Sequence, residues 1–179
     1  SVSGAGKSAM EELAKQTASL LNAREVKTEA FSRQIAFNAI PQIDAFQDND
    51  YTKEEMKMVW ETQKIMGDDS ILVNATAVRV PVFYGHAEAI HLETRAPIDA
   101  EQVKQLLADA PGVTLYEGAE QFPTQVSSAS GNDNVHVGRV RNDITHPCGL
   151  NLWVVSDNIR KGAATNSIQI AETLIQDYL

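Results

Sequence analysis

The chain has 179 residues, 43% of them apolar, which is enough for one domain with its own hydrophobic core. Its formal net charge is −9 and it has no basic run, so a nucleic-acid partner is not expected, because such binding relies on neutralising phosphates. No apolar run approaches the roughly 20 residues that cross a bilayer, so no membrane partner is expected either.

The single cysteine, Cys148, excludes a disulfide within the chain and is typical of a reducing compartment, which favours a cytoplasmic protein. The sequence shows no signal peptide. It begins at Ser1 without a methionine, and its first residues, SVSGAGKS, are typical of a strand end that turns into a helix. We therefore expect a single domain over residues 1–179 that forms the C-terminal part of a longer two-domain chain.

Apolar residues recur at helical spacing near the start and predict a helix from about Lys7 to Leu21. The glycine-rich residues before it would expose backbone N–H groups at a helix N-terminus, which is a natural site for an anion. GAGKS is similar to a phosphate-binding P-loop, but that motif requires a glycine where Ser1 stands, so the match fails. An ordinary glycine-rich helix start is the slightly favoured alternative.

A second helix is predicted in TKEEMKMVWETQKIMG, roughly Thr52 to Met66. Thr52 and Glu55 fit a capping box, which gives Glu55 a structural explanation. Glu54 and Lys57 are three residues apart and share a helix face. From these residues alone a solvated surface pair is the favoured interpretation, because such pairs are common and contribute little.

Three strands are expected next, in ILVNA, TAVRVPVF and AEAIHLET. The stretch from Val78 to His86 is unusual because it places a cation, Arg79, and an imidazole among β-branched residues. Being seven residues apart, Arg79 and His86 would lie on opposite faces of an unbroken strand, but a kink at Pro81 or Gly85 would turn both toward one cleft. Such a cleft would bind an anion and move a proton. The alternative is a rim cation and a hydrogen-bonded core histidine.

The last half of the chain predicts, in order, a short helix in PIDAEQVKQLLADAPG, a strand in VTLYEG, a loop in FPTQVSSASGNDN, strands in VHVGRVRND and GLNLWVVSD, and an amphipathic helix in KGAATNSIQIAETLIQDYL. Asp99 and Gln102 resemble the cap of the short helix. Cys148 lies in the turn between the two long strands, and Pro147 separates it from His146. A productive thiol–imidazole geometry is therefore not expected.

These elements predict an α+β fold with a mixed or mostly antiparallel sheet and helices on one face. In the strand AEAIHLET the alternation gives one buried and one open face, with His91 on the open side. An open apolar sheet face would be available to a second subunit.

The motifs SVSGAGK, EEMKMVWETQKI, VRVPVFYGHAEA, VGRVRND and LWVVSDNIRKGAA closely resemble the C-terminal catalytic and dimerisation half of bacterial aspartate-semialdehyde dehydrogenase, over essentially the whole chain. The resemblance implies a glyceraldehyde-3-phosphate-dehydrogenase-like C-terminal domain. It also implies an NADPH-dependent oxidoreductase that converts β-aspartyl phosphate to aspartate semialdehyde and phosphate through a cysteine thioester, in lysine, methionine and threonine biosynthesis. Usg-type paralogs share much of the pattern, so the alternative is a non-catalytic dimerisation or interaction module.

The resemblance implies a role for each candidate site residue. His86 corresponds to the general acid/base, and Arg79 corresponds to the arginine that binds the substrate carboxylate bidentately. Glu54 and Lys57 correspond to the residues that contact the substrate amino group and the phosphate. The register between Glu54 and Glu55 stays open at this point, as does the division of carboxylate and phosphate between Arg79 and Lys57.

For the cofactor, the resemblance implies NADP, bound mostly by an N-terminal domain, because no G-x-G-x-x-G fingerprint is present here. Asn158 corresponds to a position near the nicotinamide, and the first turn resembles part of the NADP surface through Ser3, Gly4, Ala5, Gly6 and Lys7. No metal is expected. The nucleophilic cysteine of the family would precede Ser1, and Cys148 does not match it, so we expect these residues alone to be inactive. A homodimer through the sheet face is the expected assembly.

Overall fold

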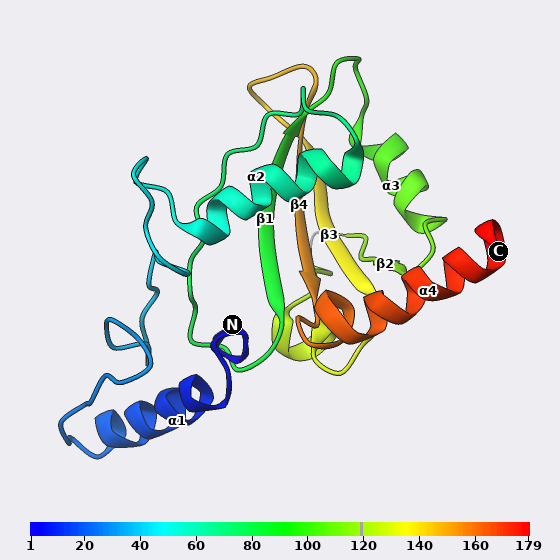
Figure 1. The fold of residues 1–179 in the computed structure, drawn as a ribbon. Coiled ribbons are helices and arrows are strands. Elements are labelled where there is room, and N and C mark those ends of the chain that lie inside the picture. The colour runs from blue at the N-terminus through cyan, green and yellow to red at the C-terminus, as the bar shows by residue number, and fades with distance from the viewer. Residues whose placement is uncertain (119) are drawn as a thin grey trace. The chain divides into compact units, whose positions relative to one another are not determined.

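A computed structural model describes residues 1–118 and 120–179 of the chain (Figure 1). These residues form two compact units, Ser1–Pro81 and Val82–Leu179. That both units belong to one domain, as the sequence predicts, stays a prediction. None of the helices in the described residues combines the length and the apolar character needed to cross a membrane.

The first unit contains two α-helices, α1 (Lys7–Leu21) and α2 (Lys53–Met66), after a single 3₁₀ turn, η1 (Val2–Ala5). The periodicity of the sequence predicted both helices, and the prediction is confirmed to within one residue at each end. The hydrophobic core of this unit forms between α1 and the segment that follows it, and consists of Val2, Ala9, Leu13, Ile35, Ala36 and Ile40.

Two buried polar side chains of α1 hold the long connection that follows this helix. Gln16, only 2% exposed, accepts the N–H groups of Ile35 (2.9 Å) and Ala36 (3.1 Å) through Oε1. Its Nε2 donates to the carbonyl oxygen of Lys27 (2.9 Å) and to Oε1 of Glu12 (2.9 Å). Because buried backbone N–H groups need partners, the path of the connection depends on these side chains.

α2 begins with the capping box that the sequence predicts. Oγ1 of Thr52 accepts the N–H of Glu55 (3.3 Å), and Oε2 of Glu55 accepts the N–H of Thr52 (2.7 Å). The second carboxylate oxygen, Oε1, accepts the N–H of Ala77 (2.7 Å) and so ties the segment after α2 to the start of the helix. At the other end Gly67 adopts a left-handed conformation with φ of 64°, which terminates the helix.

The prediction of two strands between residues 71 and 83 is wrong. This segment is not part of a sheet, and within it only Arg79 forms an isolated antiparallel bridge, with Ile40. β-branched composition predicts a strand only where a neighbouring strand offers ladder partners, and this stretch has none among the described residues. The unbroken strand through Arg79 and His86 is therefore not formed, and the chain turns at Gly85, where φ is 92°.

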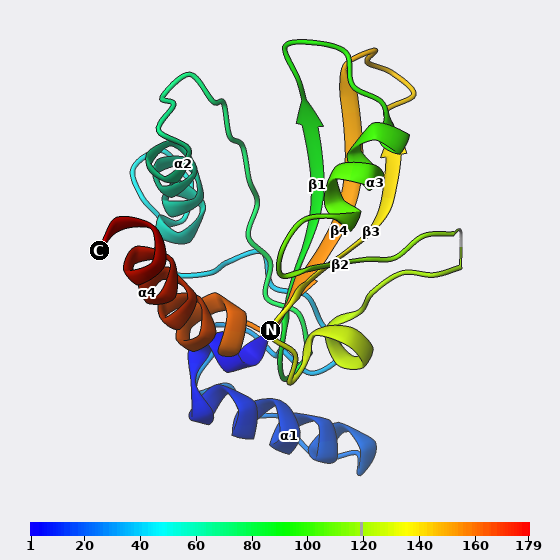
Figure 2. The same cartoon turned by 90° about the vertical axis from the view of Figure 1, so that its right-hand side faces the viewer.

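The second unit is built on a four-stranded sheet in the order β1-β4-β3-β2 (Figures 1 and 2). The strands are β1 (His86–Glu93), β2 (Val113–Leu115), β3 (Val135–Asn142) and β4 (Gly149–Ser156). β4 pairs antiparallel with β1 and with β3, whereas β2 and β3 are parallel. The α+β fold with a mixed, mostly antiparallel sheet is thus confirmed.

One face of this sheet is covered by α3 (Ala100–Ala108), which lies beside β2 and β3 (Figure 2). The predicted capping box of Asp99 and Gln102 begins the helix: Oδ1 of Asp99 accepts the N–H of Gln102 at 2.8 Å. The core under α3 contains Ala100, Val137, Val140 and Leu150, with Leu92, Leu152 and Val154 packed against them.

The opposite face of the sheet carries Ala89 and Trp153, because side chains alternate along a strand. A loop containing the π-helical turn η2 (Gln125–Ala129) covers part of it, and the indole N–H of Trp153 donates to the carbonyl oxygen of Pro123 (2.9 Å). Pro123 approaches β3 so closely that a Cβ at Gly138 would lie 2.6 Å from its Cδ. The strand therefore requires glycine at this position.

The chain closes with the turn η3 (Arg160–Ala164) and the helix α4 (Thr165–Tyr178). The amphipathic helix predicted here is formed, but none of its residues is buried. Its large exposed apolar side chains are Ile168, Ile170, Leu174, Ile175 and Tyr178.

Candidate functional site

Arg79 lies against the glycine-rich first turn within the first unit. Its Nη1 donates to the carbonyl oxygen of Ser1 (2.7 Å), and a Cβ added at Gly4 would lie 3.1 Å from that nitrogen. Burial lowers the pKa of the half-buried Arg79 guanidinium, and the charge of Glu54 opposes this change. The structure therefore joins two sets of predicted site residues, the anion-binding arginine and the turn that resembles the NADP surface.

The two predicted substrate residues of α2 form an ion pair, with Lys57 Nζ 3.3 Å from Oε2 of Glu54. Both side chains are about 40% exposed, at 41% for Lys57 and 40% for Glu54. The neighbouring Glu55 is buried, and its carboxylate already accepts the N–H groups of Thr52 and Ala77, which lowers its pKa. This geometry favours Glu54 over Glu55 as the carboxylate that can meet a ligand.

His86 begins β1 in the second unit, and its side chain is half-exposed at 53%. Its Nε2 lies 3.0 Å from Oε1 of Glu88, and the hydrogen bond with His86 is the main reason why the pKa of Glu88 is lowered. Residues two apart on a strand share a face, so the sequence HAE contained the signal for this pair, which the sequence reasoning missed. The pair places a carboxylate on one nitrogen of the imidazole and thereby orients the ring.

Gly85, the residue before His86, is held by two side chains. Its N–H donates to Oδ1 of Asn158 (2.9 Å), and its carbonyl oxygen accepts from Nε2 of Gln125 (2.8 Å). Asn158, which the resemblance assigns to the neighbourhood of the nicotinamide, thus contacts the backbone next to the candidate base. Gln125 was missed by the sequence reasoning.

The predicted site residues fall into two groups. The first unit gathers Arg79 with the glycine-rich turn and pairs Glu54 with Lys57, whereas the second unit links His86 to Asn158 through one glycine. The predicted convergence of Arg79 and His86 on one cleft joins residues of different units and stays a prediction.

Two open clefts in the described residues lie elsewhere. One, of about 490 Å³, lies in the first unit between α1 and residues 25–30, and the other, of about 640 Å³, lies in the second unit between residues 94–98 and α3. Neither is lined by a predicted site residue. The described residues also contain no group of three His, Cys, Asp or Glu side chains that could hold a metal ion.

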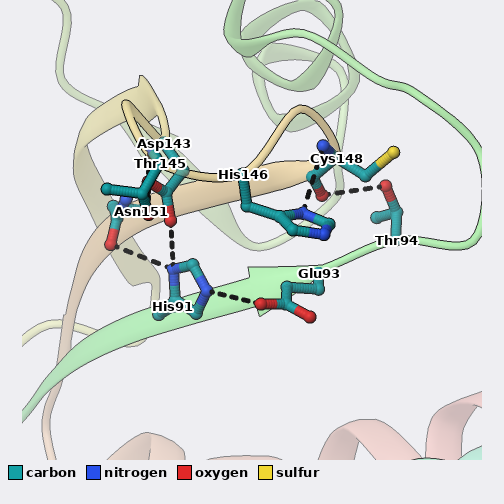
Figure 3. A network of polar contacts seen from close by, with 8 residues as sticks. All are labelled: His91, Glu93, Thr94, Asp143, Thr145, His146, Cys148 and Asn151. Atoms are coloured by element: carbon teal, nitrogen blue, oxygen red, sulfur yellow. Dashed lines mark hydrogen bonds and ion pairs between the residues drawn. The ribbon is translucent and has the colours of Figure 1, made fainter.

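A polar network joins the end of β1 to the turn between β3 and β4 (Figure 3). The ring nitrogens of the exposed His91 lie 3.2 Å from Oδ2 of Asp143 and 3.4 Å from Oε1 of Glu93. In the turn, the backbone N–H of Cys148 donates to Nδ1 of His146 (3.2 Å), and the sulfur points away from the ring (Figure 3). His146 is thus used by the backbone, in agreement with the expectation that it does not activate the thiol.

The second unit is thus an α+β unit with a mixed sheet, and the His86–Glu88 pair lies at the start of its edge strand β1. Residues 1–161 match the model of the family described as semialdehyde dehydrogenase, dimerisation domain. The chain belongs to this family, and the resemblance stated from its motifs is confirmed.

Known relatives agree with this assignment. Aspartate-semialdehyde dehydrogenase 2 of Vibrio cholerae is 68% identical over 178 residues, which is 99% of this chain and 52% of the relative. A crystal structure of aspartate semialdehyde dehydrogenase II from Vibrio cholerae, complexed with ASA, matches with a TM-score of 0.95 at 68% identity, over 99% of this chain and 53% of that one. Aspartate semialdehyde dehydrogenase from Candida albicans, solved with NADP, matches at 29% identity with a TM-score of 0.63, over 79% of this chain and 45% of that one. The chain spans about half the length of the relatives that it matches.

Proposed function

We propose that the chain is the catalytic and dimerisation half of an aspartate-semialdehyde dehydrogenase. The proposed reaction is the NADPH-dependent reduction of β-aspartyl phosphate to aspartate semialdehyde and phosphate, which supplies lysine, methionine and threonine biosynthesis. The observation that carries the proposal is the 68% identity to the Vibrio cholerae enzyme over 99% of this chain. A cytoplasmic location is part of the proposal and is supported by the single cysteine.

Substrate binding is assigned to the first unit. β-Aspartyl phosphate carries a carboxylate and a phosphate, so it needs two cations, and Arg79 and Lys57 supply them. The guanidinium suits a carboxylate because its planar fork can donate two parallel hydrogen bonds. Glu54 would receive the substrate amino group, and the exposure of its side chain supports this role.

Proton transfer is assigned to His86. It would accept the proton of the nucleophilic thiol, which Cys148 does not provide, and would return a proton during collapse of the thiohemiacetal. Its half-exposed side chain leaves the imidazole accessible to a substrate, and Glu88 on Nε2 limits rotation of the ring.

The first turn fits an anionic part of NADP. The N-cap of α1 is Gly6, which offers no side-chain cap to the first backbone N–H groups of the helix, and Gly4, Ala5, Gly6 and Lys7 are exposed. When bound, NADP supplies the hydride acceptor or donor of the reaction. Ser3 to Lys7 would hold its anionic groups, and Asn158 would lie near the nicotinamide ring.

An assay that measures NADPH formation tests the proposal. The full-length protein, supplied with aspartate semialdehyde, phosphate and NADP, is expected to form NADPH, and residues 1–179 alone are expected to form none. The substitution His86→Ala should lower turnover by about 10²- to 10⁴-fold, the usual contribution of a general acid/base. Circular dichroism should show that the variant keeps its fold, because the side chain is exposed.

The alternative, a non-catalytic module of a Usg-type paralog, predicts no turnover by the full-length protein. Absence of activity in that protein, with folding intact, would therefore refute the proposed reaction. A nearly unchanged rate in His86→Ala would leave the reaction in place and remove the proton-transfer role.

A further inference from the structure

Gly85 directly precedes β1. It is buried, and its φ is positive. Its φ of 92° is a backbone conformation that side chains rarely adopt, and a Cβ here would lie 3.0 Å from Cβ of Gln125. The β1–β4 ladder begins only at the next residue, where His86 pairs with Ser156. The hydrogen bonds of the sheet therefore do not hold Gly85, the residue that precedes the candidate base His86.

Two side chains replace the missing ladder bonds. Asn158 Oδ1 accepts the Gly85 N–H at 2.9 Å, and Gln125 Nε2 donates to the Gly85 carbonyl oxygen at 2.8 Å. An amide acceptor and an amide donor thus satisfy both backbone groups of one residue. We name this pair of side chains the Gly85 clamp.

Both halves of the clamp rest on rigid supports. Gln125 begins η2, whose cap is Thr124: its Oγ1 accepts the N–H of Ser127 at 3.0 Å. Asn158 follows Asp157, which is 5% exposed and accepts the N–H groups of Gly131 and Ile159 at 2.8 Å each. The buried carboxylate of Asp157 thus ties the segment that carries Asn158 to Gly131, and the cap at Thr124 holds the turn that carries Gln125. Both contacts restrict the movement of the two amide side chains.

We propose that Gln125, together with Asn158, is a positioning residue for the reaction proposed above: by clamping Gly85 it sets the backbone direction from which the imidazole of His86 extends. The inference rests on the proposed function. A flexible glycine next to a general base would let the ring sample many orientations, whereas proton transfer requires a donor–acceptor distance within hydrogen-bond reach. The clamp removes that freedom at the residue where the backbone is least restricted by sterics.

The substitution Gln125→Glu in the full-length protein tests the proposal, because it keeps the length of the side chain but removes the donor to Gly85. We expect kcat to fall by roughly tenfold to a hundredfold, the scale of a 1 Å misplacement. The KM values for aspartate semialdehyde and NADP should stay unchanged in Gln125→Glu, since Gln125 is not among the residues proposed to bind either ligand. Gln105→Glu, an exposed position on α3, makes the same chemical change away from Gly85 and should leave kcat unchanged.

A double-mutant cycle separates positioning from general damage. If Gln125 acts through His86, then Gln125→Glu should cause no further loss of residual turnover in a His86→Ala background. An equal fall in both backgrounds, or an unchanged kcat in the single variant, would overturn the positioning role and leave the proposed reaction standing. If His86→Ala itself keeps full turnover, the proton-transfer role fails and this inference fails with it.

A second pair of variants covers the case in which Gln125→Glu does not fold. Asn158→Asp keeps an oxygen that can accept the Gly85 N–H, whereas Asn158→Leu removes it. The clamp predicts a higher kcat for Asn158→Asp than for Asn158→Leu. Equal kcat values in the two variants, or a loss confined to the KM for NADP, would contradict the clamp.

Discussion

His136 is a buried imidazole on β3, 3% exposed, whose Nδ1 lies 3.3 Å from the hydroxyl oxygen of Tyr116. Its Nε2 is buried and has no hydrogen-bond partner among the described residues. Because burial disfavours the charged form, the pKa of His136 is lowered from its ordinary value of 6.5. Protonation of this ring thus opposes the folded state.

The lowered pKa of His136 predicts a pH-dependent stability. The unfolded chain takes up the proton at a higher pH than the folded chain, so the free energy of unfolding should decline as the pH falls below 6.5 and should level off below the folded pKa. Urea unfolding at a series of pH values, on the wild type and on His136→Phe, measures the effect. The slope in this window should be smaller in the variant, and equal slopes would assign the dependence to other groups.

Single residues of the candidate site differ in how visible they are in the sequence. Arg79 and His86 could be found because a cation and an imidazole are unusual among β-branched neighbours. Gln125 could not, because it lies in a polar loop without periodicity, and the glycine that it holds is 40 residues away. No local pattern records such a contact, since it arises only when the loop folds over the sheet.

At the scale of elements, the helices were predictable because their signals are local. Periodicity and the capping boxes at Thr52 and Asp99 predicted where α2 and α3 begin. The strands expected between residues 71 and 83 were wrong, because pairing depends on a partner strand that sequence composition does not reveal. The π-helical turn η2 was not predicted, because the polar loop in which it lies has no helical period.

Gln16 is one of the two buried polar side chains of α1 that hold the connection after this helix, and Gln16→Ala tests its contribution. The substitution leaves the buried N–H groups of Ile35 and Ala36 without an acceptor, so we expect a loss of about 2–4 kcal/mol in the free energy of unfolding. Lys15→Ala is a matched control. The exposed Lys15 forms an ion pair with Glu11 at 4.0 Å, so its loss should change the stability by less than about 0.5 kcal/mol.

Chemical denaturation measures both Gln16→Ala and its control, and hydrogen exchange locates the effect. The amides of Ile35 and Ala36 should exchange faster in Gln16→Ala, whereas those of the sheet in the second unit should not. A loss of stability as small as that of the control would show that water or a rearranged backbone satisfies these groups.

At the scale of the whole molecule, the part of the sheet face that the η2 loop leaves uncovered is the candidate dimer interface. α3 covers the face that carries Leu150, while the other face presents Ala89, an exposed residue of β1 that pairs with Trp153. The match to a dimerisation-domain family supports a role for such a surface in self-association. Small and apolar side chains suit close packing between two copies.

We therefore predict that the full-length protein is a homodimer and that Ala89→Arg weakens it. An arginine here would bury an unpaired charge in the interface, at a cost of several kcal/mol, so the dissociation constant should rise at least about a hundredfold. Ala171→Arg, on the exposed surface of α4, adds the same charge outside the sheet and should leave the dimer intact. Sedimentation at micromolar concentration measures both variants. A monomeric wild type would refute the homodimer, and a dimer unaffected by Ala89→Arg would move the interface away from this face.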